Sequence, residues 1–285
     1  ESAGICVSSG DAFRYHRDMG LVKEVFDNDR LRELKGHIAI GHVRYSTSGE
    51  SHPSNAQPLV FKYREGDLAL ATNGNLTNAR KLRRELEKRG SIFQTSTDTE
   101  VVAHLIARSR HDDIVSAVKD ALAQIEGAYA FLFMTRDTII AALDPNGLRP
   151  FVFGRLGSAY VFASETCAFD AIGATHIRDV RPGELIVVDR GGLREERFAE
   201  AKRNAICAME FIYFARPDSD MDGINVHSAR KMMGRLLAME SFVDADVVTG
   251  VPDSSISAAI GYAEQTGIPY ELGLVKNRYT GGTFI

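Results

Sequence analysis

Three positions in the first hundred residues carry groups that could together hold an amino-acid amide. The guanidinium of Arg44 can form a bidentate, charge-assisted pair with an α-carboxylate. Asp98 precedes an apolar helical pattern, where the helix dipole favours an anion and the carboxylate can receive an α-ammonium group. Asn73-Gly74 follows an apolar strand and is typical of a tight turn, whose outward N–H groups and side-chain amide can hold a developing negative oxygen.

Each of these residues also has an ordinary structural interpretation. Arg44 fits a surface arginine, Asp98 a helix cap, and Asn73-Gly74 a plain hairpin turn. Their combination, rather than any one of them, favours a site for an amino-acid amide.

Hydrophobic patterns predict the elements that position these groups. Strands are expected over residues 5–8, 37–45, 59–63 and 68–72, and again over 129–135, 138–143, 151–153, 159–163 and 184–189. Helices are expected over 79–89 and 113–125, and Thr97 and Glu100 have the spacing of a capping box before a third helix. Strands, then helices, then strands predict an α/β fold with layers in the order α, β, β, α.

The composition is that of an ordinary globular protein. The 285 residues are 44% hydrophobic and 25% charged, and the net charge of −4 argues against non-specific nucleic-acid binding. The longest apolar run, residues 128–134, is far short of the roughly 20 residues that a membrane helix needs. Three widely spaced cysteines do not form a disulfide framework, which favours a cytoplasmic location.

A charged, Ala-rich stretch over 195–203 predicts a linker between domain 1–200 and domain 201–285. After it, a strand is expected over 208–214 and an amphipathic helix over 226–239, although Gly234 weakens that helix. A strand over 245–249, a loop, a helix over 255–265 and a strand over 268–273 predict a parallel sheet of α/β type.

The loop over residues 249–254 is suited to a phosphate group. Its backbone amides and the following helix N-terminus point at an anion, and Ser254 adds a hydroxyl for a pyrophosphate or for the Mg²⁺ that it carries. An ordinary capped loop between a strand and a helix is the alternative.

Two sets of motifs resemble the amidophosphoribosyltransferase family, also called glutamine phosphoribosylpyrophosphate amidotransferases. Similarity to its glutaminase domain lies in residues 41–47, 73–78, 94–100, 143–150 and 163–170. Similarity to the start of its phosphoribosyltransferase domain lies in residues 216–219, 226–230, 248–255 and 276–279. The resemblance runs along essentially the whole chain and has the motifs of both domains in order.

This resemblance implies a four-layer N-terminal-nucleophile glutaminase domain followed by the first part of a type I phosphoribosyltransferase α/β domain. The family releases ammonia from glutamine and passes it to phosphoribosylpyrophosphate, which forms 5-phosphoribosylamine, the first committed compound of purine synthesis. Arg44 and Asp98 match the glutamine-binding positions, and Asn73 with Gly74 matches the oxyanion hole. Thr72 departs from the family, because relatives often carry His there.

The second set of motifs implies a phosphoribosylpyrophosphate site. Asp253, Ser254, Ser255 and Lys276 match binding positions, with Ser254 also at a Mg²⁺ position. Residues 276–279 resemble the mobile loop of the family, although Gly281-Gly282 stands where an Arg is common. The acidic ribose-phosphate motif is expected beyond residue 285.

None of the cysteines matches the family's nucleophile, a mature N-terminal Cys whose α-amino group can activate its thiol. Cys6 follows five residues and is expected to be a buried structural thiol, and Cys167 is expected in the core. We therefore expect that this chain lacks the opening segment and, alone, glutaminase activity. Cys207 is a candidate ligand of a 4Fe-4S cluster in the intact protein, since one thiolate cannot hold a cluster that needs four.

The expected partners are glutamine, phosphoribosylpyrophosphate, purine nucleotides as feedback inhibitors, and further copies of the chain, with no nucleic acid and no membrane. Two alternatives stay open. One is a hexosamine-forming amidotransferase that shares the glutaminase half, against which residues 248–255 and 276–279 speak. The other is a glutamine- or nucleotide-binding regulatory protein without catalysis.

Overall fold

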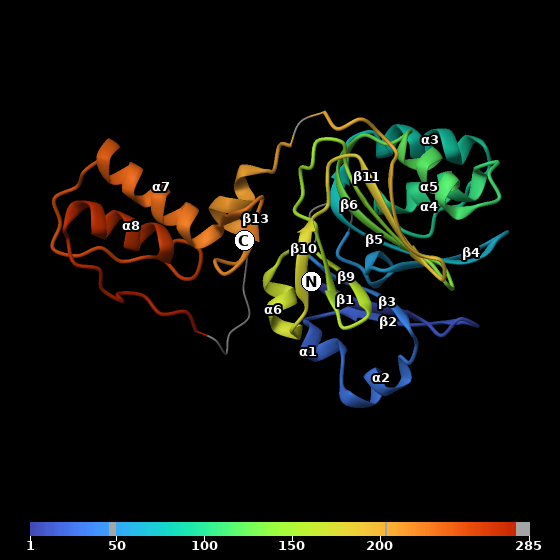
Figure 1. The fold of residues 1–285 in the computed structure, drawn as a ribbon, viewed down its shortest axis with the longest axis horizontal. Coiled ribbons are helices and arrows are strands. Elements are labelled where there is room, and N and C mark those ends of the chain that lie inside the picture. Colours follow the sequence, from blue (N-terminus) through green and yellow to red (C-terminus); the bar gives the residue numbers. More distant parts are fainter. Residues whose placement is uncertain (46–49, 203, 278–285) are drawn as a thin grey trace. The chain divides into compact units, whose positions relative to one another are not determined.

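The computed structural model describes residues 1–45, 50–202 and 204–277, and it divides the chain into two compact units (Figure 1). The first unit comprises Glu1–Arg149 and Val180–Ala205, and the second comprises Pro150–Asp179 and Ile206–Ile285. Residues 150–179, which the sequence assigns to the first domain, group with the second unit. The domain boundary after residue 200 stays a prediction.

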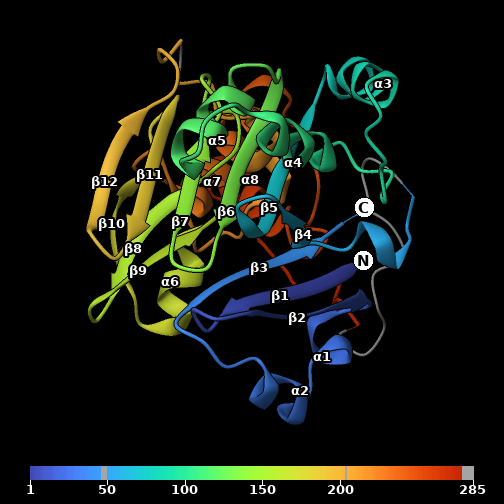
Figure 2. The same ribbon diagram turned by 90° about the vertical axis from the view of Figure 1, so that its right-hand side faces the viewer.

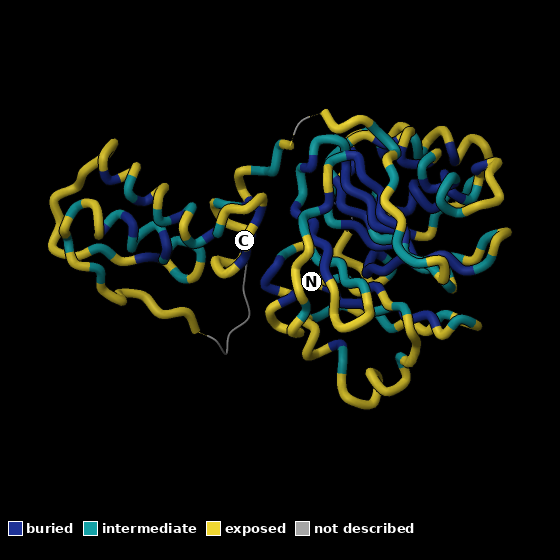
Figure 3. Tube along the Cα trace, viewed as in Figure 1, coloured by how far each residue is buried: buried dark blue, intermediate teal, exposed yellow. Residues whose placement is uncertain are grey.

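A six-stranded antiparallel sheet forms the centre of the first unit, in the order β12-β11-β7-β6-β5-β4. Its strands are β4 (Leu59–Tyr63), β5 (Gly66–Leu76), β6 (Gly127–Met134), β7 (Ile139–Leu143), β11 (Glu184–Asp189) and β12 (Gly192–Arg197). The central strands are almost wholly buried (Figure 3), which explains why their sequences are nearly continuous apolar runs.

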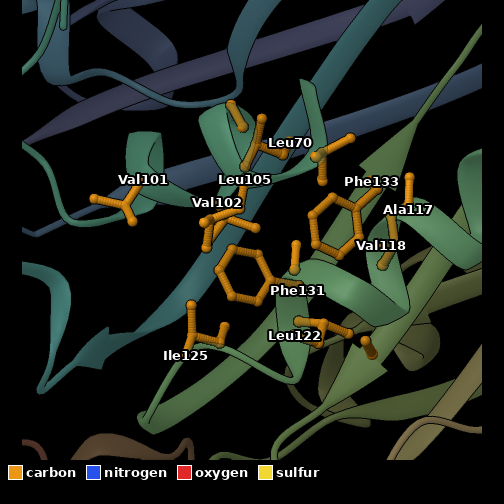
Figure 4. Close-up of a cluster of buried hydrophobic side chains, with 14 of the residues drawn as sticks. Leu70, Val101, Val102, Leu105, Ala117, Val118, Leu122, Ile125, Phe131 and Phe133 are labelled. Atoms are coloured by element: carbon orange, nitrogen blue, oxygen red, sulfur yellow. The ribbon is translucent and has the colours of Figure 1, made fainter. Parts of the chain in front are cut away.

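Three helices cover one face of this sheet: α3 (Ala79–Lys88), α4 (Thr99–Arg108) and α5 (Ile114–Leu122). Figure 4 shows Phe131 and Phe133 of β6 among the apolar side chains of α4 and α5. The two phenyl rings stack with centroids 5.1 Å apart. Burying one such side chain stabilises the fold by roughly 1.5–3 kcal/mol.

A three-stranded sheet packs on the opposite face, in the order β2-β1-β3 (Figure 2). Its strands are β1 (Ser2–Ser8), β2 (Phe13–Met19) and β3 (Ile38–Arg44). Cys6, Ile40, Ala71 and Met134 lie in the core between the sheets. The short helices α1 (Val22–Val25) and α2 (Asn28–Glu33) lie beyond the small sheet, and the 3₁₀ helix η1 (Pro53–Asn55) precedes β4. This confirms the predicted α, β, β, α order.

The tight turn expected at Asn73-Gly74 does not form. β5 continues to Leu76 and pairs with β6 along this whole stretch. Glycine is required at position 74 for another reason, because a Cβ there would lie 2.0 Å from the carbonyl oxygen of Ala128. Close approach of two strands, rather than a reversal of the chain, therefore requires glycine here.

The second unit contains a three-stranded antiparallel sheet, a short hairpin and three α-helices within the described residues. The sheet has the order β10 (Thr175–Asp179), β8 (Val152–Leu156), β9 (Ala159–Ala163), and the hairpin is β13 (Asp220–Met221) with β14 (Ile224–Asn225). The helices are α6 (Cys167–Ile172), α7 (Val226–Glu240) and α8 (Ile256–Thr266). The strand expected over 208–214 is wrong, because Glu210–Phe214 forms a π-helix, η2.

α7 and α8 pack closely through two glycines. A Cβ at Gly234 would lie 1.9 Å from the carbonyl oxygen of Ala258, and one at Gly261 would lie 2.0 Å from that of Lys231. Gly234 therefore serves helix packing, which compensates for its low helix propensity. The expected parallel pairing is reduced to one bridge between Val248 and Tyr270. No helix in the described residues has the length and apolar character needed to span a membrane.

Candidate functional site

The open edge of β5 is the backbone feature around which the candidate site is built. β4 pairs with only the first half of β5, so the second half has β6 on one side and no strand on the other. On this edge the Thr72 N–H donates to Gln57 Oε1 at 2.8 Å. Further along, the Leu76 N–H donates to Asp98 Oδ2 at 2.7 Å. Because N–H groups alternate along a strand, the Gly74 N–H points to the same edge, between these two donors, and no described residue accepts from it.

Side-chain alternation places Asn73 and Arg44 in the space between the two sheets. Ala71 of β5 lies in the inter-sheet core, and Asn73 continues that face. Ile40 of β3 lies in the same core, so His42 and Arg44 continue its face. Arg44 is only 8% exposed. The strands β3 and β5 thus present a guanidinium and an amide to one inter-sheet space.

Asp98 joins this group from the start of α4. Its Oδ2 atom is held by the Leu76 N–H, which leaves Oδ1 without a hydrogen bond among the described residues. Burial lowers the pKa of Arg44, and the charge of Asp98 acts in the opposite direction, which shows that the two groups are electrostatic neighbours. Arg44 and Asp98 therefore lie within electrostatic range of each other, and Asp98 contacts the open edge of β5.

The capping box expected from Thr97 and Glu100 does not form. The residue before α4 is Asp98, and Glu100 is fully buried, with its carboxylate turned toward the backbone N–H groups of Gln94 and Thr95. Buried N–H groups in a loop need an acceptor, and Glu100 supplies it in place of capping the helix.

His42 is a neighbour of the site that sequence reasoning missed. Its Nε2–H donates to the Thr72 carbonyl oxygen at 3.0 Å, and its Nδ1 is buried without a partner among the described residues. Burial, together with the nearby Arg44 charge and against the hydrogen bond to Thr72, lowers the pKa of His42 to about 4, so the ring is neutral at pH 7. The signal available in the sequence was its position two residues before Arg44, on the same face of a strand.

Two of the three cysteines, Cys6 and Cys167, are in surroundings that disfavour a thiolate nucleophile. Cys6 is fully buried in the inter-sheet core, and burial raises its pKa to about 12. Burial also raises the pKa of Cys167. Cys207 is partly buried, and the described residues contain no group of three His, Cys, Asp or Glu side chains that could hold a metal ion.

In the second unit, a pocket of about 410 Å³ brings together Asp253 and Lys276. The Lys276 Nζ atom lies 3.0 Å from Asp253 Oδ2. Ser255 precedes the first residue of α8, and its hydroxyl donates to the Val251 carbonyl oxygen. Ser254 precedes it in the same loop, with no hydrogen bond from its side chain to the described residues. The expectations for residues 46–47, 278–279 and 281–282 lie outside the described residues.

A model of the glutamine amidotransferase domain matches residues 42–171. The amidophosphoribosyltransferase of Bacillus subtilis (strain 168) is 59% identical over the whole of this chain, and that of Staphylococcus aureus (strain MRSA252) is 47% identical. The chain is a relative of the amidophosphoribosyltransferases. It spans 60% of the length of the first amidophosphoribosyltransferase and 58% of the second.

Two solved structures agree with this relationship. The glutamine phosphoribosylpyrophosphate amidotransferase from B. subtilis, complexed with ADP and GMP, is 59% identical with a TM-score of 0.94, and the match covers all of this chain and 62% of that one. A structure of an allosteric regulatory enzyme of purine biosynthesis is 60% identical with a TM-score of 0.95, at the same coverage. The predicted fold class and the family resemblance are confirmed.

Proposed function

We propose that this chain is part of a glutamine-dependent amidotransferase that forms 5-phosphoribosylamine from glutamine and phosphoribosylpyrophosphate, the first committed step of purine synthesis. The observation that carries the proposal is the 59% identity to an amidophosphoribosyltransferase along the whole chain, across both units. The same identity supports the enzyme over a non-catalytic regulatory protein. Extension of the similarity through the second unit argues against a hexosamine-forming enzyme that shares only the glutaminase half.

In the first unit, Arg44 holds the α-carboxylate of glutamine, and Asp98 Oδ1 receives its α-ammonium group. The Gly74 N–H and the Asn73 side-chain amide stabilise the oxyanion that forms when the amide carbon is attacked. Support comes from the open edge of β5, where the Gly74 N–H lies between two occupied donors. Each such donor typically contributes about 3 kcal/mol to transition-state stabilisation.

None of the three cysteines supplies the nucleophile in this proposal. Cys6 is a thiol at neutral pH and lies in a closed core, and Cys167 is also buried with a raised pKa. A nucleophilic cysteine must be a thiolate or have a base beside it. Hydrolysis of glutamine therefore requires a nucleophile other than Cys6 or Cys167.

In the second unit, the loop over residues 253–255 and Lys276 bind the pyrophosphate side of phosphoribosylpyrophosphate. Backbone N–H groups at the start of α8 favour an anion, and Lys276 adds a cation. Ser254 holds the Mg²⁺ carried by the substrate, which fits the ion's preference for one or two protein oxygens plus phosphates and water. Mg²⁺ would neutralise charge on the pyrophosphate leaving group.

Cys207 alone does not fit an iron–sulfur cluster, which needs four thiolates. A 4Fe-4S cluster would take its other ligands from outside the described residues, and no step is assigned to it. The complex of the B. subtilis enzyme with ADP and GMP supports purine nucleotides as inhibitors of this protein. We also propose a homo-oligomer in the cytoplasm.

The proposal is tested with Arg44→Ala in the protein expressed from its complete gene. Loss of a charged hydrogen-bond pair costs about 1.5–3 kcal/mol, so the apparent affinity for glutamine should fall roughly 10- to 100-fold. Ammonia supplied directly bypasses the glutamine site, so the ammonia-dependent rate should not change. The matched control is Arg84→Ala, since Arg84 is exposed on α3. An unsubstituted protein that forms no phosphoribosylamine with either nitrogen donor would overturn the function.

A further inference from the structure

The loop over residues 93–98 leads into Asp98 and is held by side chains. Two of its N–H groups donate to Glu100, that of Gln94 to Oε1 at 2.8 Å and that of Thr95 to Oε2 at 2.7 Å. The Thr95 hydroxyl donates to the same Oε2 atom at 2.7 Å. Three donors from two consecutive residues thus converge on one carboxylate.

Glu100 is fully buried, which makes these bonds decisive for its charge state. Burial alone would raise the pKa of the Glu100 carboxyl, but His104 and the donors of Gln94 and Thr95 outweigh burial and hold the pKa below its usual range. His104 Nε2 lies 3.6 Å away, beyond hydrogen-bond distance, so the loop donors are the closest partners. A buried carboxylate is tolerated when it is hydrogen-bonded in this way.

Two further side chains hold the same loop from other directions. Arg83 of α3 donates from Nη2 to the Thr95 carbonyl oxygen at 2.8 Å. Asn55 accepts from the Ser96 N–H at 3.0 Å and donates to the Ser96 hydroxyl at 2.8 Å. The backbone of residues 94–96 is therefore fixed by three side chains from different segments.

Unlike Arg83 and Asn55, Glu100 lies close to Asp98 in the sequence. It lies two residues after Asp98 in the first turn of α4, and its carboxylate binds residues that lie three and four positions before Asp98. Hydrogen bonds between Glu100 and Gln94–Thr95 thus close residues 94–100 into a ring, and Asp98 is one of the residues of this ring. The Leu76 N–H holds one oxygen of Asp98 from the outside. The ring limits where the second oxygen can lie.

We propose that Glu100 is a positioning residue that sets Asp98 to receive the α-ammonium group of glutamine. This inference rests on the proposed function of Asp98 and goes beyond it, because it assigns the selectivity for an α-amino group to a residue that does not touch the ligand. If Glu100 had a merely structural role, its substitution would weaken the binding of all ligands of the site equally. If it positions Asp98, its substitution should weaken only the binding of ligands that carry the α-amino group.

The test compares L-glutamate with glutarate, which lacks the α-amino group; neither ligand can be hydrolysed. Titration calorimetry is carried out on the protein expressed from its complete gene. Glu100→Gln should weaken binding of L-glutamate about 10-fold, equivalent to about 1.4 kcal/mol, and change glutarate binding less than about 2-fold. The control Glu85→Gln alters an exposed carboxylate on α3 and should change neither.

Asp98→Asn separates failure of this inference from failure of the proposed function. If Asp98→Asn abolishes the preference for L-glutamate and Glu100→Gln keeps it, the positioning role is wrong and the function stands. If Asp98→Asn keeps the preference, the role of Asp98 itself is wrong. Equal loss of both ligands in Glu100→Gln also overturns the positioning role. Should Glu100→Gln fail to fold, Thr95→Val decides by the same comparison, since it removes one donor to Glu100 and keeps the charge.

Discussion

At the residue scale, the charge state of His42 follows from its surroundings. The ring lies between the two sheets, donates to the Thr72 carbonyl oxygen and has Arg44 two residues further along the same face. Burial and the neighbouring cation both disfavour the imidazolium form. His42 therefore acts as a neutral donor that holds the peptide group directly before Asn73.

This environment predicts a loss of stability in mild acid. The folded-state pKa of about 4 lies below the unfolded value of 6.5, so the unfolded chain binds more protons between these values. The contribution of neutral His42 is fully present above pH 6.5 and is lost as pH falls toward 4. The free energy of unfolding should decrease by about 3 kcal/mol across this window.

Urea unfolding of the wild type and of His42→Gln at a series of pH values measures the effect. The variant should have a flatter pH profile between pH 6.5 and 4. His111→Gln, at an exposed histidine, should keep the wild-type slope. A slope that is the same in all three proteins would show that His42 is not the titrating group.

At the element scale, the long strand β5 serves both the sheet and the site. It pairs with β6 along its length and leaves one edge open only where β4 ends. Gln57 and Asp98 each occupy one N–H of this edge, and the Gly74 N–H stays between them. The same strand therefore needs close packing against β6 and a backbone donor directed away from it.

Gly74→Ala tests whether close strand packing requires the glycine. The added Cβ would lie 2.0 Å from the Ala128 carbonyl oxygen, so β5 and β6 must separate locally. We expect the free energy of unfolding to fall by about 1–3 kcal/mol in urea titrations, with loss of glutamine binding. Gly41→Ala on β3 is the matched control, because its Cβ would have no neighbour closer than 3.7 Å. Equal stability of both variants would contradict the packing argument.

At the scale of the whole molecule, each of the two units contains one group of candidate site residues. The first unit contains Arg44, Asn73 and Asp98, and the second contains the loop before α8 with Asp253 and Lys276. The relationship to amidophosphoribosyltransferases extends across both. The proposed transfer of ammonia from glutamine to a second substrate would use both groups of residues.

On the proposed function, we expect the 285-residue polypeptide to bind glutamine without hydrolysing it, because burial raises the pKa of both Cys6 and Cys167. An assay for glutamate release should show no rate above the uncatalysed background. Protein expressed from the complete gene should show turnover in the same assay. Turnover by the 285-residue polypeptide that Cys6→Ser abolishes would refute this expectation.

The helices of the first unit were predictable because their apolar faces repeat at helical spacing, as in α4 with Val101, Val102 and Leu105. The segment after Cys207 could not be predicted from its pattern, because Glu210–Phe214 is apolar enough for a strand but forms a π-helix. Buried Arg230 donates to the carbonyl oxygen of Phe211 in this segment and to that of Ala215 directly after it. Such a contact between distant residues leaves no trace in a local pattern.

Hydrophobic periodicity in the sequence predicted the layer order, and residue chemistry singled out Arg44, Asn73 and Asp98 as candidates, because both are local properties, while the family was indicated by the resemblance of motifs. Only the tertiary structure decided that Gly74 belongs to a paired strand and not to a turn. It also decided that Glu100 turns back to the loop before α4. The physical reason is that backbone donors must find partners once they are buried, and these partners come from residues that only folding brings together.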